Sequence, residues 1–359
     1  MDILNQLPPP PHGKIGYPWT VATLPLHKES FGQYSAENLP KISIITPSFN
    51  QGQFIEETIR SVLLQGYPNL EYIIIDGGST DETHEIIKKY SDFITYWVSE
   101  PDEGQSHAIN KGLKQATGEV FNWLNSDDFY LPNALLCVGQ HFAEHQDTYI
   151  LGGQLWVQFI NGKRLQNEGI VVENTVEETL SSRHFCQPST FFRLSIVKLL
   201  GIQSDLFFCM DLELWVNYLA HFEHKGIVKT RDFLAVFRIH KAAKTSKSHY
   251  VRYTDHINIL MCLIDSCDNK TPFPKHFQEN NAIFKRYFHK KYNLNSFNQK
   301  KLYAHIAENL LEYYCEYMSW QSVFSLYFYR LKSYPVKHLS GRFYLSPLIK
   351  IKRLFLPID

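Results

Sequence analysis

Between residues 41 and 145 the chain alternates short β-branched runs with segments of helical periodicity. The β-branched runs lie at 41–46, 71–76 and 119–124, and polar residues follow each of them. Helical patterns are expected at about 53–65, 79–90, 104–116 and 132–145, with a further strand at 93–98. This order predicts an α/β fold with a mostly parallel open sheet and helices on both faces. Polar residues that follow parallel strands meet at one sheet edge, where such folds bind ligands.

Two further regions flank this unit, which is expected to span residues 41–250. Residues 1–40 are rich in proline and are expected to form an arm that packs on the domain through Tyr17-Pro-Trp19. From residue 149 the pattern is mixed, and the expected elements are strands at 149–159, 170–173 and 233–239 and helices at 191–200 and 211–222. Residues 251–359 are expected to form a helical, aromatic and basic C-terminal region.

The segment 325–359 carries seven Lys or Arg residues and one acidic residue. One interpretation is a basic surface helix that contacts anionic lipid near a lipid-linked acceptor. The other is that these residues pack on the catalytic domain or on another subunit. We favour membrane contact.

Composition excludes several classes of protein. The formal net charge of zero gives no general attraction to nucleic acid. Six cysteines without a CxxC pair indicate reduced thiols and a cytoplasmic setting. The N-terminus lacks the features of a secretory signal, and no apolar run approaches the ~20 residues that span a bilayer. We therefore expect a cytoplasmic protein, soluble or peripheral on the inner face of the cytoplasmic membrane.

Two groups of polar residues at the expected sheet edge suit a nucleotide-linked substrate. Asp76, beside the Thr46 loop, could accept a hydrogen bond from a nucleobase imino group, or it could be an ordinary turn aspartate. Asn125-Ser-Asp-Asp128 could supply oxygen ligands for Mg²⁺ or Mn²⁺, or it could cap the following helix. Its place directly after a buried strand favours the metal site. A cation bound there would stabilise a leaving diphosphate.

Asp211 is the candidate general base. It starts a helix amid Phe, Cys, Met, Leu and Trp, a setting expected to raise its pKa so that it can accept a proton from a sugar hydroxyl. The alternative is a simple N-cap aspartate. Glu213 faces another side of the helix and is the weaker candidate.

Several ordered motifs together resemble glycosyltransferase family 2. They are Ile-Thr-Pro-Ser-Phe-Asn (45–50), Ile-Asp-Gly-Gly-Ser-Thr-Asp (75–81), Ser-Glu-Pro-Asp-Glu-Gly-Gln-Ser (99–106), Ala-Ile-Asn-Lys-Gly (108–112), Leu-Asn-Ser-Asp-Asp (124–128), Gln-Pro-Ser-Thr-Phe-Phe (187–192), Met-Asp-Leu-Glu-Leu-Trp (210–215) and Phe-Arg-Ile-His (237–240) through Lys244-Thr245. The resemblance covers roughly residues 41–250. It implies the GT-A fold and inverting transfer of a sugar from a nucleotide donor, usually with Mg²⁺ or Mn²⁺.

The resemblance also implies roles for individual residues. The metal site would consist of Asp127, Asn125 and Asp128, and the catalytic base would be Asp211. Gln187 and Pro188 would lie on the acceptor side. The donor-binding residues would be Thr46, Pro47, Phe49, Asp76, Ala108, Asn110, Ser126, His240 and Lys244.

Two positions depart from the family pattern. Asn125 replaces the first Asp of the metal motif, and Met210 replaces the Glu of the family's Glu-Asp pair. The Leu-Asn-Ser-Asp-Asp variant is similar to a branch found in bacterial O-antigen and exopolysaccharide assembly, so we interpret both changes as features of that branch.

These residues predict an inverting transferase that uses a UDP-hexose or UDP-N-acetylhexosamine and a saccharide acceptor, free or lipid-linked. GDP is an alternative carrier, because guanine also offers an N–H. A sugar nucleotidyltransferase is disfavoured because the loop at 47–52 has no basic residue. A nucleotide-sugar binding protein without transferase activity stays open because of Asn125 and Met210.

Overall fold

The computed structural model describes residues 3–22, 36–181, 185–244, 249–267 and 288–306. These residues form two compact units. The first contains the described residues up to 170, together with 185–214 and 225–244. The second combines 171–181 and 215–224 with 249–267 and 288–306, so its boundaries differ from the simple division expected near residue 250.

Nine strands of the described chain belong to one sheet. They are β1 (Ile42–Ser48), β2 (Leu70–Asp76), β3 (Tyr96–Ser99), β4 (Val120–Trp123), β5 (Phe129–Tyr130), β6 (Ile150–Phe159), β7 (Arg164–Asn167), β8 (Thr190–Arg193) and β9 (Ile227–Ile239). The α-helices are α1 (Gly52–Leu63), α2 (Thr83–Lys89), α3 (Gln105–Gln115), α4 (Ala134–Glu144), α5 (Val176–Ser181), α6 (Leu194–Leu200), α7 (Met210–Phe222) and α9 (His249–Asp265). Short 3-10 turns lie at Ile3–Asn5, Ala36–Asn38, Ser91–Phe93 and Gln187–Ser189.

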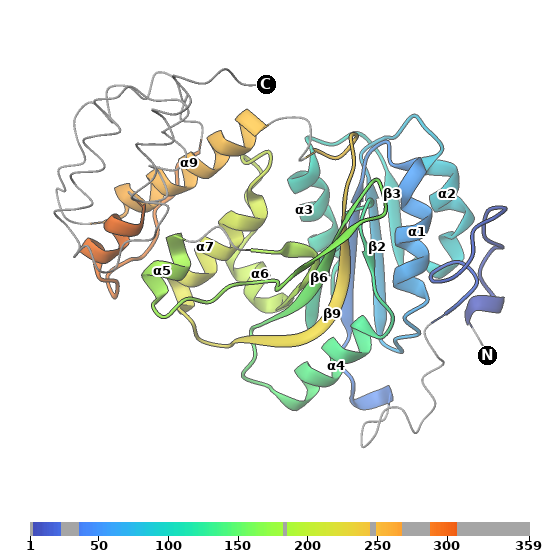
Figure 1. Ribbon diagram of the computed structural model, residues 1–359, viewed down its shortest axis with the longest axis horizontal. Coiled ribbons are helices and arrows are strands. Elements are labelled where there is room, and N and C mark those ends of the chain that lie inside the picture. The colour runs from blue at the N-terminus through green and yellow to red at the C-terminus, as the bar shows by residue number, and fades with distance from the viewer. Residues whose placement is uncertain (1–2, 23–35, 182–184, 245–248, 268–287, 307–359) are drawn as a thin grey trace. The chain divides into compact units, whose positions relative to one another are not determined.

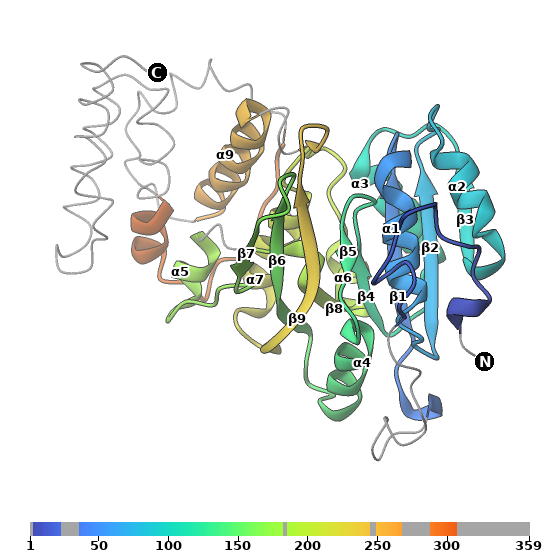
Figure 2. The ribbon, with the colours of Figure 1, turned by 45° about the vertical axis from the view of Figure 1, so that its right-hand side comes forward.

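The strand order is β3-β2-β1-β4-β8-β6-β9-β5, with β7 paired to β6. Strands β3, β2, β1 and β4 are parallel, as the sequence predicted. Beyond β4 the sheet is mixed, because β8 runs antiparallel to both β4 and β6. The long strands β6 and β9 are parallel and lie side by side (Figure 2).

Helices cover both faces of the parallel half of the sheet. Figure 1 shows α3 on one side of β1–β3 and α1 with α2 on the other. Right-handed crossovers explain this arrangement, because the chain steps outward from β1 to β3 and then returns past β1 to β4. The apolar stripe of α1, formed by Ile55, Ile59, Val62 and Leu63, is buried in the core as its spacing predicted.

The helix expected from residue 79 begins later, because residues 79–82 make other contacts. The Ser79 hydroxyl donates to Asp76, and α2 begins only at Thr83. Asp81 serves two helix starts instead: its Oδ1 accepts from the Thr83 amide at 3.0 Å and its Oδ2 from the Gly52 amide at 2.9 Å. Burial alone would raise the pKa of Asp81, but these hydrogen bonds lower it below its usual value.

Three other expected elements differ in the structure. Residues 190–193 form β8 rather than helix, because they pair with β4 and β6. Residues 170–173 form no strand, since the hairpin partner of β6 comes earlier, at β7. Helix α4 begins at Ala134 instead of Pro132, because Asn133 has a left-handed conformation with φ of 65°.

The described part of the N-terminal arm is tied to α1 by the buried side chain of Arg60. Its guanidinium donates to the carbonyls of Pro8, Pro18 and Trp19 at 2.8, 2.9 and 2.7 Å. Trp19 is itself buried, and its ring packs on the same guanidinium. The arm therefore contacts the domain through Tyr17-Pro-Trp19, where the sequence placed the contact, and through an arginine that the sequence did not single out.

Two other expectations concern the chain as a whole. None of the helices in the described ranges is long and apolar enough to cross a bilayer. Within those ranges Cys137, Cys186, Cys209, Cys262 and Cys267 form no disulfide. The segment 325–359 lies outside the described residues.

Candidate active site

A tight turn directly after β4 carries the expected metal-binding residues. The Asp128 amide donates to the Asn125 carbonyl at 3.0 Å, which closes the turn. Ser126 and Asp128 are buried, whereas Asn125 and Asp127 are half-buried. The turn therefore leaves the Asp127 carboxylate open to a ligand while its neighbours face protein.

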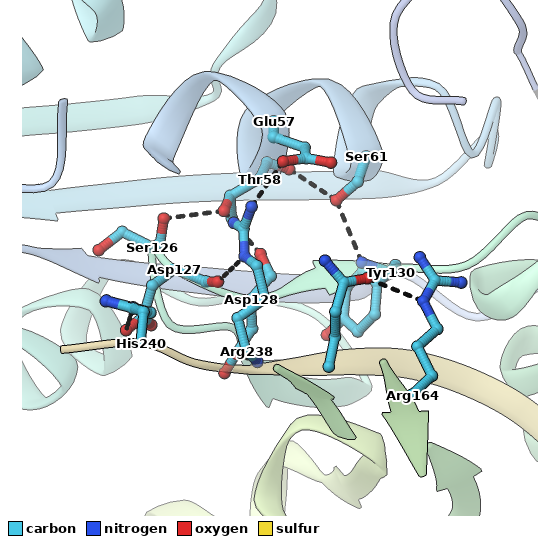
Figure 3. A network of polar contacts seen from close by, with 11 residues as sticks. Glu57, Thr58, Ser61, Ser126, Asp127, Asp128, Tyr130, Arg164, Arg238 and His240 are labelled. Atoms are coloured by element: carbon cyan, nitrogen blue, oxygen red, sulfur yellow. Dashed lines mark hydrogen bonds and ion pairs between the residues drawn. The ribbon is translucent and has the colours of Figure 1, made fainter. Parts of the chain in front are cut away.

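Asp127 lies beside His240, which follows the last residue of β9. The Asp127 Oδ2 atom is 3.1 Å from His240 Nε2. Figure 3 shows the two side chains beside each other. The imidazole packs on the Phe54 ring with 4.2 Å between centroids, and its buried Nδ1 atom has no hydrogen-bond partner in the described residues. The fold thus joins two predicted site residues that are more than a hundred positions apart.

Asp128 has a different environment from Asp127. It is fully buried, and its Oδ1 accepts a hydrogen bond from the Arg238 amide at 2.9 Å. Burial and the neighbouring Asp127 carboxylate raise the pKa of Asp128 well above its usual value. One oxygen of the Asp128 carboxylate therefore contacts the β9 backbone, and the other accepts from the Asn125 side-chain amide at 3.5 Å.

Asn125 and Lys244 are connected through Gln105, the first residue of α3. The Gln105 amide donates to Asn125 Oδ1 at 2.7 Å and its carbonyl accepts from Lys244 Nζ at 3.2 Å. Lys244 also donates to the Phe207 carbonyl and lies 4.1 Å from the centroid of the Phe207 ring. These contacts bring the later loop that contains Lys244 to the same sheet edge as the Asn125 turn.

The ends of β1 and β2 contain the other predicted donor-site residues. Thr46 and Pro47 are buried, and Thr46 Oγ1 lies 3.1 Å from the Tyr72 hydroxyl. Phe49 is 59% exposed, so its ring is free to stack on a nucleobase. Asp76 is fully buried, and its carboxylate accepts hydrogen bonds from the Ser79 amide and hydroxyl and from the Ser99 hydroxyl.

Four predicted residues pack within the protein. Ala108 is buried in α3, and the Asn110 amide donates to the Ile202 carbonyl at 2.9 Å. Gln187 is buried, and its amide donates to Asn122 Oδ1 and to the Trp123 carbonyl. The Pro188 carbonyl accepts from the Asn122 amide at 3.0 Å. Gln187 and Pro188 thereby hold the end of β4 from which the Asn125 turn emerges.

Asp211 and Glu213 differ in accessibility at the start of α7. Asp211 is half-buried, and its Oδ1 accepts from the Leu212 amide at 2.8 Å. Glu213 is fully buried. Asp211 also affects Cys186: burial and the nearby Asp211 carboxylate raise the pKa of that thiol to about 12. Of the two carboxylates, Asp211 is the one a substrate can reach.

A pocket of about 480 Å³ lies beside His240, between the ends of β6 and β9. Its lining residues are Phe159, Ile160, Asn161, Ile239, His240 and Lys241. The pocket thus combines apolar side chains with amide, imidazole and ammonium groups next to the Asp127–His240 pair.

Three residues that were not predicted from the sequence lie at or next to the Asn125 turn (Figure 3). Arg238 and Thr58 contact carbonyls of the turn, and Glu57 forms an ion pair with Arg238. Arg238 lies inside the Phe-Arg-Ile-His motif, so the motif contained a signal for it. Thr58 and Glu57 lie on α1 and are connected to the turn only by the tertiary fold.

The side chains at the site can be compared with the ligands that a divalent cation needs. In the described ranges no three His, Cys, Asp or Glu side chains converge on a point that could hold a metal ion. Asp127 and His240 supply two such side chains. Mg²⁺ bound through one or two carboxylates, substrate phosphates and water needs no further protein ligand. The residues present therefore fit a cation that binds together with a diphosphate.

Comparison with known proteins identifies the family. The sequence profile of the family described as Glycosyl transferase family 2 matches residues 43–200. The match identifies residues 43–200 as a glycosyltransferase family 2 region. The matched residues extend from β1 through α6, so the family 2 region contains the Asn125 turn and the expected donor-binding strands.

Relatives of this chain come from several bacteria. It is 29% identical over 224 residues to an uncharacterized glycosyltransferase of Rickettsia typhi, a match covering 54% of this chain and 64% of that protein. Over 236 residues it is 27% identical to the GalNAc(5)-diNAcBac-PP-undecaprenol beta-1,3-glucosyltransferase of Campylobacter jejuni. That match covers 62% of this chain and 74% of that protein.

Solved structures share the architecture of this chain. The structure of Staphylococcus aureus TarS 1–349 in complex with UDP-GlcNAc has a TM-score of 0.53 and 20% identity, and the match covers 82% of this chain and 88% of that one. This likeness concerns the fold, which is GT-A as the sequence resemblance implied.

Proposed function

We propose that this protein is an inverting glycosyltransferase that moves a sugar from a UDP-hexose or UDP-N-acetylhexosamine to a hydroxyl of a saccharide acceptor in bacterial surface polysaccharide or O-antigen assembly. The observation that carries the proposal is the Asp127–His240 pair at the carboxyl edge of the parallel strands. A half-buried carboxylate beside an imidazole suits a cation and the diphosphate that leaves during transfer.

The donor would lie along the ends of β1, β2 and β4. The exposed Phe49 ring would stack on the base, and Asp76 would accept the uracil imino hydrogen on an oxygen that it now shares with serine donors. The name of the TarS complex with UDP-GlcNAc supports UDP as the carrier. Lys244, held near Asn125 through Gln105, would assist at the diphosphate.

Mg²⁺ or Mn²⁺ would be held by Asp127 and His240, with Asn125 beside them. Such a cation stabilises negative charge on the leaving diphosphate. We assign Asp127 and not Asp128 as the carboxylate ligand, because Asp128 is fully buried against the Arg238 amide.

Asp211 would act as the general base. In this mechanism it accepts the proton of the acceptor hydroxyl while the acceptor oxygen bonds to the anomeric carbon. The bond from that carbon to the diphosphate oxygen breaks on the opposite side, which inverts the configuration. A half-buried carboxylate at a helix start is accessible to such a hydroxyl, and a positioned base contributes about 10²–10⁴-fold to the rate.

The acceptor class and location are also proposals. The Campylobacter jejuni relative is named for an acceptor on an undecaprenyl diphosphate carrier. This name supports a lipid-linked saccharide as the acceptor and the inner face of the cytoplasmic membrane as the place of transfer. The pocket beside His240 offers space for part of a substrate.

The test is a thermal-shift screen of UDP-, GDP- and dTDP-sugars with and without Mn²⁺, followed by measurement of donor hydrolysis. A UDP-sugar should raise the melting temperature most in the presence of Mn²⁺, because a ligand that binds the folded state stabilises it. Hydrolysis of that donor would then exclude a binding protein without activity. Release of diphosphate from UTP and a sugar phosphate would instead indicate a nucleotidyltransferase and contradict the proposal.

A further inference from the structure

The three backbone carbonyls at residues 126–128, around the Asp127 side chain, are all contacted by side chains from other elements. The Thr58 hydroxyl on α1 shares its one hydrogen between two of them, because Oγ1 lies 2.9 Å from the Ser126 carbonyl and 2.6 Å from the Asp128 carbonyl. Arg238 on β9 donates its Nε–H to the carbonyl between them, that of Asp127. These bonds are visible together in Figure 3. Anchoring successive carbonyls fixes the peptide planes on both sides of Asp127 and thereby the direction in which its side chain leaves the backbone.

Arg238 makes three further contacts that hold its guanidinium in place. Its Nη1 forms an ion pair of 2.5 Å with Glu57 Oε2 on α1. The guanidinium lies 5.0 Å from the Phe54 ring centroid and 5.2 Å from that of Phe129. The residue is only 7% exposed, so it is held between α1 and the turn.

An arginine is needed for this geometry. Its planar guanidinium presents Nε and Nη1 in fixed directions, so one group reaches a carbonyl and a carboxylate at once. A lysine ammonium at the same place carries the charge but has no Nε–H directed at the Asp127 carbonyl. A buried ion pair adds little stability compared with apolar residues of the same volume, so stability alone does not account for the pair. Its position beside the turn indicates a geometric role.

We propose that Arg238, oriented by Glu57, is a positioning residue that presets the Asp127 carboxylate for a divalent cation and the donor diphosphate. Arg238 acts through the Asp127 backbone and does not itself touch the cation. The expected effect on metal and donor binding rests on the proposed function. The positioning of Asp127 itself rests on the contacts of the turn. Residues that orient a ligating side chain typically contribute about 10–100-fold to metal affinity.

The test compares Arg238→Lys and Arg238→Gln with Arg193→Lys and Arg193→Gln. Arg193 is a matched control because it also donates to backbone carbonyls and packs on a phenylalanine ring. Its guanidinium lies 5.3 Å from the centroid of the Phe142 ring. The carbonyls that it contacts are those of Phe142, His145, Gln146 and Thr148. It contacts neither Asp127 nor the turn in any of these interactions. Each variant is measured for melting temperature, for Mn²⁺-dependent UDP affinity by calorimetry, and for amide hydrogen exchange over residues 125–130.

Both Arg238 variants should weaken Mn²⁺-dependent UDP binding by about 10–100-fold, while metal-free UDP binding changes little. Glu57→Gln should produce a smaller loss in the same direction, because Arg238 keeps its bond to the Asp127 carbonyl. The Arg193 variants should lower the melting temperature without changing Mn²⁺-dependent affinity. If the Arg238 variants lose affinity no more than the Arg193 variants do, the positioning role is wrong.

Hydrogen exchange separates this inference from the proposed function. Absence of any Mn²⁺ effect on UDP binding by the native protein would contradict the proposed metal site, whatever the variants do. Faster exchange over residues 125–130 in Arg238→Gln, but not in Arg193→Gln, would still support the positioning of the turn. Unchanged exchange in Arg238→Gln would overturn it.

Discussion

Asp127 and Asp128 are chemically identical neighbours that the fold places in different surroundings. Asp127 is half-buried beside His240, whereas Asp128 is fully buried and accepts a hydrogen bond from the Arg238 amide. A sequence motif cannot distinguish them, since both follow the same strand. Exposure and hydrogen-bond partners support our proposal that Asp127 binds the metal and that Asp128 has a structural role.

Asp127→Asn should therefore abolish Mn²⁺-dependent UDP binding measured by calorimetry. Asp128→Asn should retain that binding within a few-fold, because the amide oxygen can still accept from the Arg238 backbone. Far-UV circular dichroism should be native in both variants. Equal loss in the two variants, or loss only in Asp128→Asn, would show that the wrong aspartate has been assigned.

Asp211→Asn should lower sugar transfer by ~10²–10⁴-fold, because the amide keeps the shape of the side chain but cannot accept the acceptor's proton. Donor affinity should change little, since the base acts on the acceptor. Asp205→Asn is the control, because Asp205 is exposed in the loop before α7 and should be silent. Near-normal turnover in Asp211→Asn would remove Asp211 from the mechanism.

At the scale of elements, Glu71 at the start of β2 joins segments that are distant in sequence. Its carboxylate accepts hydrogen bonds from Ser43 on β1 and Thr117 before β4, and it pairs with Lys41 at 2.6 Å. Burial raises the pKa of Glu71, but these partners outweigh it and lower the pKa to about 2. The ionised carboxylate thus links β1, β2 and the segment before β4 at the edge opposite the site.

The lowered pKa of Glu71 predicts how stability depends on pH. Because the folded pKa is below the unfolded value of 4.5, the stabilisation is complete above pH 4.5 and is lost as the pH falls towards about 2. The contribution is about 2–3 kcal/mol. In urea unfolding at pH 6, Glu71→Gln should have a free energy of unfolding lower than that of the native protein by this amount. The difference between the two proteins should shrink towards pH 3. Glu85→Gln, with an exposed side chain, should show no such difference.

At the scale of the whole molecule, the C-terminal basic segment suggests where the protein works. Residues 325–359 carry seven basic residues, and their role in membrane contact stays a prediction from the sequence. Truncation after Ser325 should reduce sedimentation with vesicles that contain phosphatidylserine, and high salt should have the same effect on the full chain because it screens surface charge. Failure of the full chain to sediment at low salt would show that the segment does not bind anionic lipid.

The sequence by itself determined the parallel half of the sheet and the residues at its edge. β-branched runs, helical spacing and the polar residues after each run are local properties, and they predicted β1, β2 and β4 with the intervening helices. The placement of Thr46, Asp76 and Asp127 at one edge of the sheet followed from the rule that parallel strands end at one edge.

Only the tertiary structure decided which of these residues are open to a ligand. Burial of Asp76, Asp128 and Gln187, and the contact of Asp127 with His240, depend on packing between segments far apart in the chain. The strand at 190–193 shows the same limit, since pairing with β4 and β6 overrides a local helical pattern. Thr58 and Arg238 approach the turn from α1 and β9, and long-range contacts of this kind leave no periodic signal in sequence.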